Sequence, residues 1–139
     1  MLKVVLDTNV IISALYSPSG ISAEVLRLAR KKKVTNLISP HILYEVRRVL
    51  TKRLSWSPEK VEQTIRWLKS FSLIVRPPKK FLKVISACPP DDRILECAVE
   101  GKADYIVSDD HHLKDLEEFQ GIKIVVPTAF LTLIKKQIK

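Results

Sequence analysis

Cysteine, glycine and aromatic residues are scarce in this chain, and each scarcity argues against a class of protein. Two cysteines cannot build the disulfide framework of a small secreted domain. We predict that Cys97, in an apolar helical stretch, is a core residue and that Cys88, before two prolines, lies near the surface. Three glycines leave no glycine-rich turn after a predicted strand, which argues against a nucleotide-binding Rossmann domain. Aromatic residues make up 6% of the chain and do not interleave with its basic clusters, so phosphate contact is a better expectation than base stacking.

Long apolar runs are also absent. No stretch approaches the roughly 18 consecutive apolar residues that a transmembrane helix needs, so we expect no association with a membrane. The first residues form a strand-like segment and lack the basic head and cleavage site of a signal peptide, so we expect a cytoplasmic protein. A length of 139 residues without a linker or repeat fits a single domain over 1–139.

Positive charge is in excess. The chain has 24 lysine and arginine residues against 15 acidic ones, a formal net charge of +9. This excess suits an anionic partner, most simply nucleic acid, although a solvated lysine-rich surface gives the same count. The basic residues cluster at 27–33, 47–48, 52–53, 77–80 and 135–139.

Short apolar runs alternate with amphipathic segments along the chain. Strands are predicted at 2–6, 35–39, 72–78, 104–108 and 122–126. Helices are predicted at about 9–16, 23–33 with Ser22 as its cap, 40–53, 58–70, 91–100, 111–119 and from 127 onward. The apolar runs are continuous rather than alternating, which is typical of strands covered on both faces. We therefore predict a single-domain, three-layer α/β/α sandwich with a mainly parallel central sheet of about five short strands.

Acidic residues follow the predicted strands. Asp7 comes directly after the first strand, Asp110 follows the strand at 104–108, and Asp92 opens the helix before that strand. Ligands bind at the carboxyl ends of the strands in an open parallel sheet, so these carboxylates converge if the two strands are neighbours. Glu45 lies at or beside the packed face of its helix, where a carboxylate needs a cation or an arginine as its partner.

Each of these acids also has a simpler explanation. A helix cap or a first-turn position accounts singly for the aspartates, and a surface position accounts for Glu45. Together, however, clustered carboxylates repel one another unless a cation neutralises them, and carboxylates with water suit Mg²⁺ or Mn²⁺. The combination favours a metal-dependent phosphodiester hydrolase whose basic surface holds a polyanion.

Three blocks in this order resemble the PIN-domain ribonucleases over nearly the full length: VVLDTNVII, SPHILYEVRRVL and PPDDRILECAVEGKADYIVSDDHHL. The resemblance implies catalytic, metal-coordinating roles for Asp7, Glu45, Asp92 and Asp110. It implies supporting roles for Thr8, Asn9, Asp91, Glu96, Ser108 and Asp109. Asp92 is preferred to Asp91 because Leu95 and Ala98 follow it at the spacing of the motif. His112 stands where many members carry a further acid.

The resemblance also implies an activity and partners. Small stand-alone members of the VapC type are similar to the toxins of toxin–antitoxin pairs. We therefore expect a Mg²⁺- or Mn²⁺-dependent endoribonuclease that cleaves single-stranded RNA, with a small antitoxin protein as its partner and a homodimer as its assembly.

Two rival functions remain open to different degrees. A non-catalytic RNA-binding or RNA-processing module on the same fold is the alternative, and the retained acids argue against it. A phosphoacceptor signalling domain would need two acids after the first strand, where this chain has Asp7 and Thr8. It would also need an aspartate after a middle strand, where the chain has Arg76-Pro77-Pro78.

Overall fold

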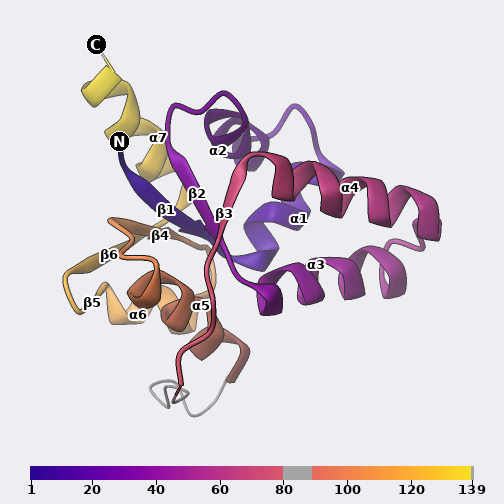
Figure 1. Cartoon of the computed structure of the whole chain (residues 1–139). Coiled ribbons are helices and arrows are strands. Elements are labelled where there is room, and N and C mark those ends of the chain that lie inside the picture. The colour runs from indigo at the N-terminus through magenta and orange to yellow at the C-terminus, as the bar shows by residue number, and fades with distance from the viewer. Residues whose placement is uncertain (80–88, 139) are drawn as a thin grey trace.

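The strands form one sheet in the order β3-β2-β1-β4-β6-β5 in the computed structural model, which describes residues 1–79 and 89–138 (Figure 1). They are β1 (Lys3–Leu6), β2 (Thr35–Ile38), β3 (Ser72–Ile74), β4 (Tyr105–Val107), β5 (Glu118–Phe119) and β6 (Ile122–Val125). Every neighbouring pair is parallel except β5 and β6, which are antiparallel. The prediction of a mainly parallel sheet is confirmed.

Helices cover both faces of this sheet (Figure 1). They are α1 (Thr8–Tyr16), α2 (Ile21–Arg30), α3 (Pro40–Lys52), α4 (Pro58–Ser70), α5 (Pro89–Glu100), α6 (His111–Leu116) and α7 (Pro127–Ile138). On one face α2 packs against both α1 and α7, while on the other α5 contacts β1 and β2 and α6 contacts β6. Within the described ranges, no helix combines the length and apolar character needed to cross a membrane.

The centre of the sheet is apolar on both faces, as continuous apolar runs predict. Val4, Val5 and Ile106 have no exposed surface, and Leu6 retains only 1% of its surface. Cys97 is 2% exposed, which confirms it as a core residue, and its burial raises the pKa of its thiol to about 12. Cys88 lies outside the described residues.

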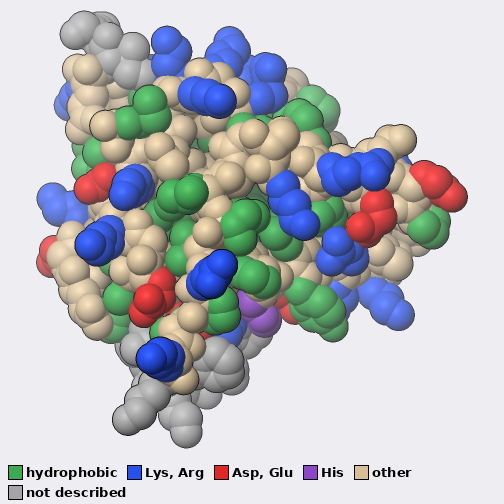
Figure 2. Space-filling view, viewed as in Figure 1, with side chains coloured by type: hydrophobic (Ala, Val, Ile, Leu, Met, Phe, Trp, Pro, Cys, Tyr) green, Lys and Arg blue, Asp and Glu red, His purple; other side chains and the backbone are tan. Residues whose placement is uncertain are grey.

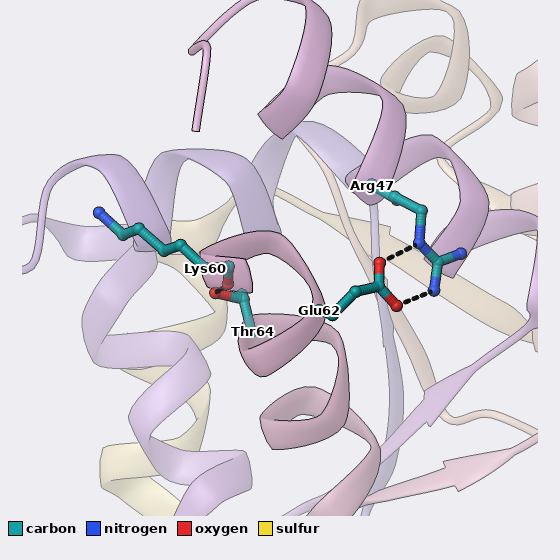
Figure 3. Close-up of polar contacts among 4 residues, drawn as sticks. All are labelled: Arg47, Lys60, Glu62 and Thr64. Carbon is teal, nitrogen blue, oxygen red and sulfur yellow. Dashed lines mark hydrogen bonds and ion pairs between the residues drawn. The ribbon is translucent and has the colours of Figure 1, made fainter. Parts of the chain in front are cut away.

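Helices α3 and α4 lie side by side and project from the sheet (Figure 1). Each begins at a Ser-Pro pair, where the serine hydroxyl accepts a backbone hydrogen bond: Ser39 from Ile42 and Ser57 from Lys60, both at 3.2 Å. A two-bond ion pair joins the helices, with Arg47 Nε and Nη2 donating to the two carboxylate oxygens of Glu62 at 2.8 and 3.1 Å. Figure 3 shows this pair beside a hydrogen bond within α4. The pair helps to hold α3, which lines the candidate site.

The region around 117–122 differs from its prediction, because a short hairpin replaces the end of a helix. The helix predicted at 111–119 ends at Leu116, and Glu117 adopts a φ of 60°. Gln120 and Gly121, at φ of 49° and 83°, then form the two-residue turn between β5 and β6. Two positive φ angles in succession are the geometry of a tight hairpin turn, so the sheet gains a sixth strand.

The bounds of β3 and α2 also differ from their predictions. The strand predicted at 72–78 is limited to three residues in β3. Helix α2 begins before Ser22, so Ser22 is not its cap, and it ends at Arg30 rather than Lys33. Lys32 adopts a φ of 58°, and the amides of Lys32 and Lys33 donate to carbonyls of the last turn at 3.0 and 2.9 Å. This Schellman turn stops the helix and redirects the lysine run toward β2.

Candidate functional site

The order of the strands changes direction beside β1, which pairs with β2 on one edge and β4 on the other. Asp7 follows β1, and residues 108–110 follow β4, so both segments lie at the carboxyl edge of the sheet. The Asp7 amide donates to the Val107 carbonyl at 3.0 Å and holds the two segments together. Such a switch point is where open α/β sheets bind their ligands.

The Ser108 hydroxyl connects two of the acids. Its Oγ donates to Asp7 Oδ2 at 2.7 Å and accepts from the backbone amide of Asp110 at 3.0 Å. Ser108 has no exposed surface, so it holds these partners in the interior. A hydroxyl can donate and accept at once, which allows one side chain to orient the Asp7 carboxylate and the start of the next loop.

The Asp7 carboxylate lies in surroundings that disfavour its charge. Burial is the largest influence and raises its pKa, and the hydrogen bond from Ser108 opposes this. The nearby negative charge of Asp110, and to a lesser extent that of Asp109, raises the pKa of Asp7 further, while the Thr8 amide lowers it. A buried carboxylate beside another carboxylate is relieved by a bound cation or by a proton.

Helix capping explains Asp110 and does not explain the Asp7 side chain. Asp110 Oδ1 accepts from the His112 backbone amide at 2.8 Å and caps α6. Asp7 occupies the N-cap position of α1, but its side chain makes no capping hydrogen bond. Its Oδ2 faces Ser108 instead. Asp7 is therefore placed by the junction of β1 and β4.

A cleft of about 250 Å³ opens at this edge of the sheet. Its lining includes the acids Asp7, Glu45, Asp91 and Asp110, the polar residues Thr8 and Asn9, and the basic residues His41, Arg48 and Arg53. The four acids come from separate segments: the ends of β1 and β4, the middle of α3 and the first turn of α5. The fold therefore brings distant acids to one cleft, as the sequence predicts for the strand ends.

The Glu45 carboxylate forms an ion pair with Arg48. Arg48 Nη2 lies 2.9 Å from Glu45 Oε2, and Arg48 Nε donates to Oε1 at 3.4 Å. The Glu45 side chain is 17% exposed and that of Arg48 is 43% exposed, and both residues line the cleft. Each group is positioned to meet a charged ligand that enters.

The basic residues of the cleft were not predicted from the sequence, which pointed only to Glu45 on α3. In the structure His41, Arg48 and Arg53 line the cleft with Glu45. Their offsets from Glu45 of four, three and eight residues are helical spacings for one side, so the same periodicity argument would have found them.

His41 adds an imidazole ring to the lining of the cleft. Burial has the largest effect on the pKa of His41 and lowers it. The charges of Glu45 and Glu96 raise this pKa, whereas the charge of Arg93 lowers it. Its Nε2 atom is buried and has no hydrogen-bond partner within residues 1–79 and 89–138.

The PIN domain family matches residues 3–112 of this chain. The chain belongs to the PIN-domain family. PIN domains as a family are nucleases, and the matched range contains all four acids of the cleft.

Comparison with other proteins agrees with this assignment. "Uncharacterized protein MJ1680" of Methanocaldococcus jannaschii is 32% identical to this chain, and the alignment covers 88% of this chain and 81% of that protein. The crystal structure of VapBC2 from Rickettsia felis, bound to a DNA fragment from its promoter, has a TM-score of 0.64 at 18% identity and covers 88% of this chain and 97% of that one. PAE2754 from Pyrobaculum aerophilum has a TM-score of 0.59 at 19% identity, covering 95% and 89%. At these identities the two structures support the PIN fold alone.

The Asp91-Asp92 pair of this PIN domain lies at the start of α5, and the two carboxylates point in different directions. Both residues lie in the first turn of α5 and are buried, at 5% and 3% exposed. Asp91 and Ile94, one turn apart, line the cleft, whereas Asp92 does not. Adjacent helical residues point about 100° apart, so the two carboxylates cannot face the cleft equally. Asp91 therefore joins Asp7, Glu45 and Asp110 at the cleft, and the metal-coordinating role assigned to Asp92 stays a prediction.

The remaining predicted residues lie around the cleft. Glu96 is 4% exposed, forms an ion pair with Arg93 at 3.0 Å, and does not line the cleft. Asp109 is exposed and acts on Asp7 through its charge.

The donor groups of the cleft suit a hard divalent ion. Across the described residues, no three His, Cys, Asp or Glu side chains form a ready-made metal cluster. The cleft offers carboxylates and neutral oxygen donors, and the buried Asp7 lies beside a second carboxylate. Mg²⁺ keeps several of its waters and takes one or two carboxylates directly, so this arrangement fits a partly hydrated ion better than an all-protein cage.

Proposed function

We propose that this PIN domain is a Mg²⁺- or Mn²⁺-dependent endoribonuclease that hydrolyses phosphodiester bonds in single-stranded RNA. The observation that carries the proposal is the meeting of Asp7, Glu45, Asp91 and Asp110 in one cleft at the switch point of the sheet. Carboxylates on a basic protein suit both a hard cation and a phosphate chain. Membership of a nuclease family supports the same chemistry.

The acids divide into direct and water-mediated ligands in this proposal. Asp7 and Asp110, joined through Ser108, would hold the ion directly, and Glu45 and Asp91 would do so through water. A bound divalent ion supplies charge stabilisation at the phosphate and acidifies an attacking water. The hydrogen bond from Ser108 fixes the orientation of the Asp7 carboxylate, which preorganises the site before RNA binds.

The basic residues of the cleft give the RNA backbone its anchor. Arg48 and Arg53 line the cleft beside the acids, and a guanidinium can donate two hydrogen bonds to one phosphate. Arg48 would donate to a phosphate in place of the Glu45 carboxylate once a cation neutralises Glu45. A cleft of about 250 Å³ accepts a phosphate with part of a sugar, and a single strand can bring an isolated phosphate into such a recess, which supports a single-stranded substrate.

The biological role follows from similarity to toxin–antitoxin proteins. We propose that the chain is the toxin of such a pair, with a small antitoxin protein as its partner, acting in the cytoplasm as a homodimer. The structural likeness to VapBC2 supports the partner. Tyr44 on α3 and Trp67 on α4 are 56% and 39% exposed, and these rings support a protein interface on the projecting helices. Light scattering of the purified chain, alone and mixed with a candidate antitoxin, tests both assemblies.

One observation favours a second candidate function, a non-catalytic RNA-binding module. The Glu45 carboxylate is paired with Arg48, so an arginine stands where a cation would otherwise neutralise it. RNA held by the wild-type protein and never cleaved, with or without metal, supports this candidate.

Cleavage of a labelled single-stranded RNA separates the two candidates. We expect wild-type protein to cleave it with Mg²⁺ or Mn²⁺ and to stop in EDTA. Asp7→Asn and Asp110→Asn should bind the RNA while cleaving it at least about 100-fold more slowly, because each removes a charged ligand. Cleavage that persists unchanged in EDTA rules out the metal mechanism. Cleavage at the wild-type rate in both variants rules out the assigned acids.

A further inference from the structure

A second groove lies between α2 and α7 and shares no lining residue with the acidic cleft. Its volume is about 550 Å³, and its apolar floor is made by Leu28 of α2 and by Leu131 and Ile134 of α7. The two helices pack against each other along this line. The groove is therefore a trough with two helical walls.

The edges of this trough are strongly basic. Arg27, Lys31 and Lys135 line it, and Glu24 is the only acid among its lining residues in the described chain. Further exposed bases follow at the ends of both helices: Arg30, Lys32, Lys33 and Lys136. Figure 2 shows basic side chains gathered at the top of the view, over the turn after α2 and beside α7.

The periodicity of the walls suits a third helix. The lining residues of α2 recur at 24, 27, 28 and 31, and those of α7 at 131, 134 and 135, so each wall is one helical face. An amphipathic helix packs its apolar ridge into such a groove and meets the rim with its polar flanks. Single-stranded RNA fits less well, because the described lining residues include no aromatic ring on which a base could stack.

We propose that the α2–α7 groove docks an acidic amphipathic helix of a partner protein. Apolar side chains of that helix contact Leu28, Leu131 and Ile134, and its glutamates or aspartates meet Lys31 and Lys135. The charge of the rim selects against a basic helix. The groove lies apart from the cleft acids, so this docking site does not depend on the proposed ribonuclease activity.

A designed peptide tests the proposal directly. The probe is a fluorescein-labelled helical peptide with leucines at i, i+3, i+4 and i+7 and glutamates on its flanks, and the matched peptide has lysines in place of the glutamates. The protein variant carries Lys31→Glu and Lys135→Glu, which are both exposed. The control carries Lys69→Glu and Lys102→Glu, two exposed lysines at the ends of other helices. Fluorescence anisotropy gives the affinities, and thermal melting checks that all proteins fold.

The expected binding depends on the charge of the peptide and on the position of the substituted lysines. The acidic peptide binds wild type and control alike, binds the Lys31→Glu/Lys135→Glu protein roughly tenfold more weakly or worse, and weakens in high salt. The lysine peptide does not bind wild type. Equal binding of the acidic peptide to wild type and the double variant overturns the proposal, as does equal binding of both peptides to wild type or no binding at all.

Two parallel measurements identify other occupants. RNA binding is measured with Asp7→Asn protein, with and without the two groove substitutions. A roughly tenfold loss of RNA affinity with unchanged peptide affinity makes this an RNA surface and overturns the proposal. Sedimentation that shows a dimer dissolved by the groove substitutions assigns the groove to a second copy and also overturns it. An unchanged RNA cleavage rate alongside lost peptide binding supports a docking role separate from the nuclease site.

Discussion

Replacing Ser108 with alanine removes one oxygen atom from the junction between β1 and β4. Asp7 Oδ2 loses a 2.7 Å hydrogen bond, and the Asp110 amide loses its 3.0 Å acceptor. Ser108 has no exposed surface, so water does not simply replace the hydroxyl. Removing a buried hydrogen bond to a charged group, while that group stays in place, lowers the free energy of unfolding by about 1–3 kcal/mol. For a domain of this size we expect a melting temperature lower by roughly 4–10 °C.

The catalytic effect of the same change has a distinct signature. Removing a group that orients a metal ligand typically costs about 10–100-fold in metal affinity or activity. The Ser108 hydrogen bond lowers the pKa of Asp7, so its loss raises that pKa further. The acid limb of the pH–rate profile for RNA cleavage should therefore move to higher pH in Ser108→Ala.

Calorimetry and a pH series of RNA cleavage, run on wild type and Ser108→Ala, measure both effects. Ser13→Ala, at an exposed serine of α1, is the matched control and should leave both quantities unchanged. A Ser108→Ala protein that melts within about 1 °C of wild type and keeps its pH–rate profile refutes the positioning role of this hydroxyl.

Three further predictions follow from the same structure. Burial raises the pKa of Asp7 in the folded protein, so stability falls as pH rises above the ordinary value of 3.8, and metal-free Asp7→Asn should melt higher than wild type at pH 7. Asp91→Asn should slow RNA cleavage more than Asp92→Asn, because only Asp91 lines the cleft; the reverse order restores the assignment made from sequence. Arg47 and Glu62 are 41% and 52% exposed, so a double-mutant cycle by urea unfolding should give a coupling of at most about 1 kcal/mol, and a larger value contradicts the solvent-exposed geometry.

Much of the fold was predictable because the core strands are continuous apolar runs. The runs ending at Leu6 and Val107 are buried on both faces and identify a parallel sheet. The hydroxyls of Ser39 and Ser57 accept capping hydrogen bonds at the helix starts that the Ser-Pro pairs predict. These signals are local, so they need no knowledge of the tertiary contacts.

The turns that the sequence did not predict depend on positive backbone φ angles, which amino-acid composition does not reveal. Lys32, Glu117 and Gln120 adopt positive φ angles, although glycine is the residue usually expected there. Gly101 directly follows α5 and is needed mainly for space, because a Cβ at this position would lie 2.7 Å from Leu37 Cδ1. The left-handed residue of that turn is Lys102.

The candidate site was predictable in outline and not in its individual side chains. The meeting of Asp7 and Asp110 follows once their strands are neighbours, which the sheet confirms. The choice between Asp91 and Asp92 turns on the rotation of α5, and two adjacent aspartates give no periodic signal that separates them. Arg48 was not predicted as a cleft residue because charged residues on a helix are usually solvated. In the structure, Arg48 forms an ion pair with Glu45 at the cleft.

Titration of metal-free protein with Mn²⁺ by isothermal calorimetry tests the central claim most directly, since it asks whether the cleft acids bind a divalent ion. Wild type should bind Mn²⁺, and Asp7→Asn should bind it at least about tenfold more weakly. Asp115→Asn, at an exposed aspartate of α6, should bind like wild type. Wild type that takes up no Mn²⁺, or Asp7→Asn that binds it as tightly as wild type, contradicts the metal site proposed for this PIN domain.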